Sequence, residues 1–100
     1  MKIHYKNKKL EKICTDYEEA KKCYNINMAK KIGYAIMVIN SASTVEFLIQ
    51  NKICKCHKLK NNRKNEFSMH LEEPYRLIFE EENKILKLKE VKIISIVDYH

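Results

Sequence analysis

Residues 67–80 read FSMHLEEPYRLIFE, and their spacing decides the fold. Phe67, Met69 and Leu71 alternate with polar residues, and an alternating pattern resumes after Pro74. A period of two predicts strands that each bury one face. Only residues 72–74 separate the two strands, so we expect residues 67–71 and 75–80 to pair antiparallel.

Further strands are expected on both sides of this hairpin. An apolar run predicts a buried final strand over residues 91–98, and weaker patterns predict strands over 2–5, 53–59 and 85–89, the last after a turn at 83–84. Apolar stripes at helical spacing and capping residues predict helices over 7–14, 16–22, 28–39, with Asn27 as its N-cap, and 44–49. Helices followed by strands indicate an α+β fold with helices on one face of an antiparallel sheet.

Length and charge limit the kind of protein. One hundred residues predict a single domain over 1–100. No apolar run approaches the ~20 residues that span a bilayer, and the first residues lack the apolar core of a signal peptide, so we expect a cytoplasmic protein without a membrane partner. The net charge is +7, and six cations and no acid lie between residues 52 and 64. This charge favours an anionic partner such as nucleic acid.

The cysteines are Cys14, Cys23, Cys54 and Cys56. In a cytoplasmic chain we expect free thiols, not disulfides. The run Cys54-Lys55-Cys56-His57 also admits a metal site. In a strand, however, the two cysteines point to one face and His57 to the other, which suits shared ligation poorly. We therefore predict packed thiols and no bound metal.

The final strand ends in three polar groups, Asp98, Tyr99 and His100, all of which handle protons. Chain ends usually fray, and folding alone does not require such groups there. One interpretation is a solvated tail of chance composition. The other is that the strand carries these groups into a site formed by the rest of the sheet.

Three motifs resemble the HigB branch of the RelE/ParE toxin superfamily, the plasmid maintenance killer proteins. Residues 57–68 are similar to the family pattern H-x-L-x-G-x-R-x-G-x-[WY]-S, residues 74–80 to its aromatic-Arg-Ile strand, and residues 96–100 to its D-Y-H ending. The two glycines of the first pattern are here Asn61 and Asn65. Asparagine tolerates a positive φ better than most residues, so the loop can keep its course.

This resemblance implies a RelE-like microbial RNase fold, with N-terminal helices packed on a curved antiparallel β-sheet. It implies a toxin of a type II toxin-antitoxin system that cuts mRNA in the A site of the 30S ribosomal subunit. It also implies a helix-turn-helix antitoxin of the HigA type as partner. Carried over by position, the family's catalytic residues fall on His57, Lys60, Arg76, Asp98, Tyr99 and His100. Lys58, Arg63 and Lys64 are expected to contact RNA.

The chemistry of these side chains suits RNA cleavage without a metal or another cofactor. A base takes the 2′-hydroxyl proton, positive charge stabilises the phosphorane, and an acid protonates the leaving 5′-oxygen. We predict His57 and His100 as the proton-transfer pair and Arg76 with Lys60 as the charge-stabilising groups. Two alternatives stay open: a gyrase-inhibiting toxin of the same fold that is not an enzyme, and a basic RNA-binding module without catalysis.

Overall fold

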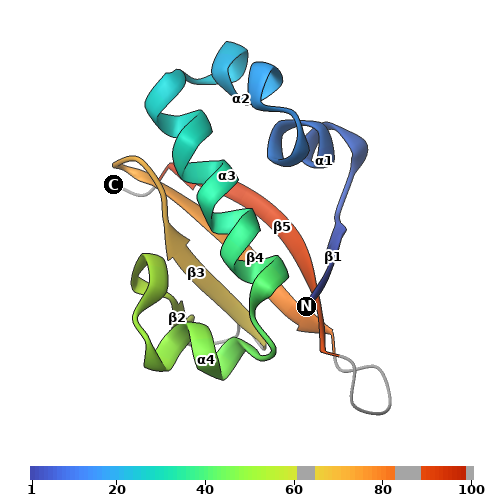
Figure 1. The fold of residues 1–100 in the computed structure, drawn as a ribbon, viewed down its shortest axis with the longest axis vertical. Coiled ribbons are helices and arrows are strands. Elements are labelled where there is room, and N and C mark those ends of the chain that lie inside the picture. Colours follow the sequence, from blue (N-terminus) through green and yellow to red (C-terminus); the bar gives the residue numbers. More distant parts are fainter. Residues whose placement is uncertain (61–64, 83–88, 99–100) are drawn as a thin grey trace.

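The computed structural model describes residues 1–60, 65–82 and 89–98 and has an α+β architecture (Figure 1). The helices in these ranges are α1 (Lys8–Thr15), α2 (Tyr17–Cys23), α3 (Ile26–Ser41), α4 (Val45–Gln50) and the short 3₁₀ helix η1 (Ile53–Lys55). The strands are β1 (Lys2–Tyr5), β2 (His57–Lys58), β3 (Glu66–His70), β4 (Tyr75–Glu82) and β5 (Glu90–Asp98). The predicted α+β class is confirmed.

The described strands form one sheet in the order β1-β5-β4-β3-β2. The hairpin predicted from residues 67–80 is confirmed, because β3 and β4 pair antiparallel with His70 opposite Arg76. β5 pairs antiparallel with β4, and β2 with β3. β1 instead runs parallel to β5, so the expectation of a wholly antiparallel sheet was wrong at this edge. A parallel pair needs a long connection, and the helices that follow β1 in the chain supply part of the length that lets β5 run in the same direction as β1.

One face of the sheet packs against the helices and forms the core. Met69, Leu77, Phe79 and Ile93 point to this face and are completely buried, together with Ile39 of α3. Figure 1 shows α3 crossing the sheet on this side. Side chains alternate between the two faces along a strand, so the residues that lie between these core positions, and their cross-strand partners, point to the opposite face. We call it the site face; it carries Lys2, His4, His57, Glu66, Ser68, His70, Arg76, Ile78, Glu80, Glu82, Glu90, Lys92, Ser95 and Val97.

Asparagine, aspartate and threonine side chains begin the helices. Asn7 accepts a hydrogen bond from the Leu10 amide, Asp16 accepts from two amides of α2, and Thr44 accepts from Phe47. These bonds satisfy amides that lack a partner in the first turn of a helix. The predicted N-cap Asn27 was wrong: Asn25 caps α3, its Oδ1 lying 2.8 Å from the Met28 amide nitrogen.

The strand predicted over residues 53–59 was largely wrong. The chain forms η1 there, and only His57 and Lys58 pair as a strand. Lys52, Cys54 and Lys55 have φ values of 50–53°, and this left-handed backbone cannot continue an extended strand. Asn65 does adopt the positive φ expected of it, at 58°. The turn predicted at 83–84 and, except for Lys89, the strand predicted over 85–89 lie outside the described residues.

Candidate functional site

Two rows of cross-strand neighbours bring polar groups together at one end of the site face. His57 lies opposite Ser68, which lies opposite Ile78. In the next row, His70 of β3 lies opposite Arg76 of β4. Neighbours within a row are about 5 Å apart, so these side chains share one surface. We call His57, His70, Glu73 and Arg76 the histidine–arginine site.

The two imidazoles of this site are neighbours. The ring centroids of His57 and His70 are 6.4 Å apart, with an angle of 67° between the ring planes. His57 Nδ1 lies 3.0 Å from the backbone oxygen of Lys55. A carbonyl only accepts hydrogen bonds, so Nδ1 carries the proton and Nε2 is the nitrogen of a neutral His57 ring that can exchange one.

Glu73 connects His70 to Arg76. Its Oε1 lies 3.5 Å from His70 Nδ1, and its Oε2 accepts a hydrogen bond of 3.2 Å from Arg76 Nη2. Arg76 Nη1 donates a second hydrogen bond, 2.9 Å long, to the Tyr75 carbonyl. Only 13% of the Arg76 side chain is exposed, whereas 69% of Glu73 is. The guanidinium is therefore held in place, and its carboxylate partner lies on the outer side.

The electrostatics of the site follow from these contacts. The pKa of His70 is lowered, first by burial and then by the nearby Arg76, although the Glu73 carboxylate opposes the change. Lys55 and His57 lower the pKa of His70 further. The pKa of Glu73 is lowered as well, mainly by its hydrogen bond from Arg76. At neutral pH the site thus presents a neutral His70 beside an ionised Glu73 and a charged Arg76.

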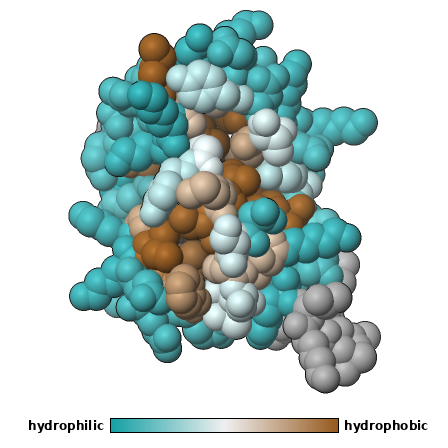
Figure 2. Space-filling view, in the orientation of Figure 1, coloured by the Kyte–Doolittle hydropathy of each residue, from teal (hydrophilic) through white to brown (hydrophobic). Residues whose placement is uncertain are grey.

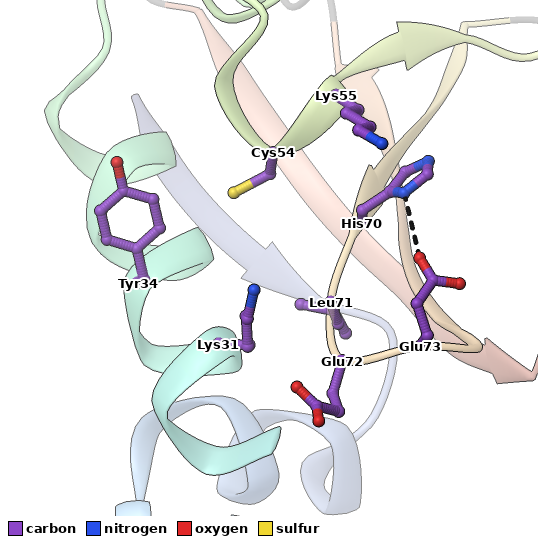
Figure 3. A pocket seen from close by; sticks show the side chains of 8 residues that line it. All are labelled: Lys31, Tyr34, Cys54, Lys55, His70, Leu71, Glu72 and Glu73. Atoms are coloured by element: carbon purple, nitrogen blue, oxygen red, sulfur yellow. Dashed lines mark ion pairs between the residues drawn. The ribbon is translucent and has the colours of Figure 1, made fainter. Parts of the chain in front are cut away.

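A pocket of about 490 Å³ opens next to His70 (Figure 3). Its walls come from α3, which supplies Lys31 and Tyr34, from η1, and from the β3–β4 turn. Figure 3 shows Lys55 reaching toward the His70 ring from the side opposite Glu73. The pocket gives a ligand access to the edge of the histidine–arginine site.

The structure brings together some of the predicted catalytic residues. His57 and Arg76 lie on the same end of the site face. Lys60 is exposed just after β2, at the same edge of the sheet. Asp98 pairs with Tyr75, whose side chain points to the face opposite Arg76, so the register places Asp98 on the helix-covered face. Tyr99 and His100 lie outside the described residues.

The predicted RNA-contacting residues lie near the same edge where they are described. Lys58 is exposed and pairs with Phe67, which directs its side chain away from the site face. Arg63 and Lys64 lie outside the described residues. His70 and Glu73 were not among the residues predicted from the sequence. Their spacing was a usable signal, since residues 70, 73 and 76 lie at equal intervals across a tight hairpin turn.

The cysteines are free thiols, as predicted. Cys56 is buried, and burial raises the pKa of its thiol to about 12, so it is protonated at neutral pH. Within residues 1–60, 65–82 and 89–98, no group of three His, Cys, Asp or Glu side chains is placed to hold a metal ion. In the same part of the chain, no helix combines the length and apolarity needed to cross a membrane.

The sheet carries a second histidine–glutamate pair at its other end. His4 of β1 contacts Glu90 of β5 through Nε2 and Oε1. Both residues belong to the site face, but Glu90 lies opposite Glu82, and His4 lies opposite Lys92. Variants of His4 and Glu90 can therefore serve as controls for variants of His70 and Glu73.

Comparison with known proteins identifies the fold. A YoeB/ParE toxin from Agrobacterium tumefaciens has a similar structure, with a TM-score of 0.66 and 15% identity over 100% of both chains. A YoeB dimer from Staphylococcus aureus gives a TM-score of 0.62 and 24% identity over 100% of this chain and 97% of that one. No protein-family model and no curated protein matches the sequence. The chain therefore has the fold of the YoeB/ParE toxins, with helices on a mixed five-stranded sheet in its described part.

Proposed function

We propose that this protein is the toxin of a type II toxin-antitoxin system and acts as an mRNA endoribonuclease on the ribosome. The observation that carries the proposal is the placement of His57, His70 and Arg76 side by side on one face of a sheet. Two imidazoles beside a fixed guanidinium match the needs of phosphodiester cleavage. The fold shared with YoeB/ParE toxins and the sequence resemblance to the HigB branch agree with this function.

Each group has a chemical role in this proposal. Arg76 binds the scissile phosphate, because its planar fork matches two phosphate oxygens. Lys60, exposed two residues after β2, adds positive charge. His57 transfers a proton through Nε2, with His100 as its predicted partner. Asp98, on the other face of the sheet, is suited to orienting the end of the chain, and Tyr99 to stacking on a base.

The partner in this proposal is an antitoxin of the helix-turn-helix type, as the family resemblance implies. A protein partner is supported by the outer surface of α3, where Ile26, Tyr34 and Met37 are 51–55% exposed, and by Phe47 of α4 at 49%. Figure 2 shows apolar residues gathered on the face that α3 crosses. Exposed apolar surface of this kind is typical of interaction sites.

Expression of the protein in a bacterial host tests the proposal directly. We expect growth arrest and, by primer extension, new 5′ ends inside translated regions of messages. The His57→Gln variant should abolish these ends. The His4→Gln variant changes the histidine at the other end of the sheet, and it should behave as wild type. Intact messages together with stalled DNA replication would replace the nuclease with the gyrase-inhibiting alternative.

Dependence on the ribosome needs its own measurement. Lys58, the described member of the cations expected to bind RNA, lies on an edge strand of a small domain, so we expect contacts with the ribosome to supply much of the binding surface. The purified protein should cut messages on translating ribosomes and leave the same naked RNA intact. Efficient cleavage of naked RNA would contradict this part of the proposal.

A further inference from the structure

We propose that His70 accepts the proton of the substrate's 2′-hydroxyl group and that Glu73 is the positioning residue that holds its ring for this step. The inference rests on the proposed endoribonuclease function and assigns two residues that the sequence analysis left without a role. It stands on the contacts of the His70–Glu73–Arg76 chain.

The position of His70 suits a proton acceptor. It lies directly opposite Arg76, the group that binds the scissile phosphate in the proposal, so its ring is within reach of the ribose attached to that phosphate. About a quarter of its side chain is exposed (24%), and the ring borders the 490 Å³ pocket. A nucleotide can therefore reach the ring without opening the core.

Glu73 selects the tautomer that this step needs. Its Oε1 faces His70 Nδ1 at 3.5 Å, as the dashed line in Figure 3 shows. The negative charge of the ionised carboxylate at this distance favours the tautomer of the neutral ring that carries its proton on Nδ1. Nε2 is then the unprotonated nitrogen. A carboxylate that fixes a histidine tautomer in this way is a recurrent device in proton-transfer sites.

Burial first, and then the surrounding charges, keep His70 in its neutral, accepting form. The cations around it come from three elements: Arg76 on β4, Lys55 on η1 and Lys31 of α3, which lines the same pocket. His57 on β2 faces it as well. The acids are Glu73, in contact with the ring, and Glu72, on the pocket wall. Partial burial, followed by Arg76, outweighs the one carboxylate in contact, which is why the pKa of His70 is lowered.

The step balances without any further reactant. The 2′-hydroxyl proton moves to His70 Nε2 as the 2′-oxygen forms a bond to phosphorus. The bond from phosphorus to the 5′-oxygen breaks, and that oxygen takes the Nε2 proton of a protonated His57 ring, which lies beside His70. The products are a 2′,3′-cyclic phosphate and a 5′-hydroxyl end. His70 later returns its proton to solvent.

Single-turnover cleavage of a message on translating ribosomes, measured from pH 5.5 to 8.5, tests the inference. We expect His70→Gln to lower the rate about 10²-fold or more at every pH. In Glu73→Gln the carboxylate that raises the pKa of His70 is gone, so the acid limb of the rate profile should move to lower pH. A purely structural Glu73 would lower the rate without moving that limb. The control variants His4→Gln and Glu90→Gln alter the matched pair and should leave the profile unchanged.

A second measurement does not depend on activity. Nitrogen chemical shifts of the His70 ring in the free protein should show a proton on Nδ1 and none on Nε2 at pH 7.5, and this preference should weaken in Glu73→Gln. A His70→Gln rate within threefold of wild type, or a proton on Nε2, would overturn the inference. If His70→Gln fails to fold, the Glu73→Gln profile and the ring shifts decide. Wild-type protein that cuts no message on ribosomes would instead refute the proposed function itself.

Discussion

The site face carries two histidine–glutamate pairs, and they differ in which partner is buried. At one end, Glu90 is 20% exposed and His4 is 40% exposed. At the other, His70 is 24% exposed and Glu73 is 69% exposed. In the first pair the carboxylate of Glu90 is the more buried group, and the imidazole of His4 is the more exposed one. In the second pair the imidazole of His70 is the more buried group, and the carboxylate of Glu73 is the more exposed one.

The charges around each pair differ as well. His4 shares its end of the face with carboxylates that lie in two opposed pairs, Glu66 with Glu80 and Glu82 with Glu90. His70 has Arg76 directly opposite and Lys55 close by. On the site face at the first end, these four carboxylates outnumber Lys2 and Lys92, so the balance of charge disfavours phosphate there, whereas the cations around His70 favour it at the second end. The same two residue types therefore suit RNA chemistry at only one end of the sheet.

The largest effect is expected from Arg76→Ala. This change removes the fork that binds the phosphate, and we expect cleavage on ribosomes to fall about 10²- to 10³-fold. Arg76→Lys should recover little, because a single ammonium cannot reproduce two parallel hydrogen bonds. Lys92→Ala changes a cation at the opposite end of the face and should leave cleavage near wild type. Equal losses in the Arg76 and Lys92 variants would show that the two ends do not differ in function.

Much of the fold could be predicted because local patterns determine it. The period of two in residues 67–80 and the apolar run of β5 predicted the confirmed strands, and apolar stripes at helical spacing, with Asp16 as a correctly placed cap, predicted the helices. η1 could not be predicted, since nothing in the side chains of Lys52 or Cys54 signals a left-handed backbone. The choice between Asn25 and Asn27 as N-cap had no local signal either, because both are asparagine.

The candidate site was only partly predictable. His57 and Arg76 came from the family resemblance, and the register then places them on one face. The position of Asp98 depends on a bulge: the register slips between Ile78 and Phe79, so that Ile93 pairs with Phe79 and Ser95 with Ile78. Ile94 is the extra residue, and after it the side chains of β5 point to the opposite faces from those that simple alternation would give. Simple alternation from Ile93 would have placed Asp98 on the site face.

A smaller effect is expected from the lysines at the site end. Lys58→Ala and Lys60→Ala remove exposed cations next to β2, and each should weaken ribosome binding several-fold at low salt. Each change should also reduce the slope of log affinity against log salt by about 1 if the lysine contacts a phosphate. Lys2→Ala, an exposed lysine at the carboxylate-rich end, is the control and should change neither quantity. Binding can be followed by sedimentation with ribosomes at several salt concentrations.

The smallest effect is expected on the free energy of unfolding, and it tests whether the surroundings of His70 keep its ring neutral. Burial and Arg76 lower the pKa of His70 from its ordinary 6.5, so the unfolded chain binds this proton first as the pH falls. The stability that the folded protein gains from keeping His70 neutral is complete above pH 6.5 and is lost as the pH drops below it.

Between pH 7 and 5.5, stability from urea unfolding should fall less steeply in His70→Gln than in wild type. It should fall more steeply in Glu73→Gln, which lacks the carboxylate that supports the charged ring. The carboxyl group of Glu73 contributes little in this range, because its own pKa lies below 4.5. The reverse order of slopes would mean that the cations around His70 do not set its charge.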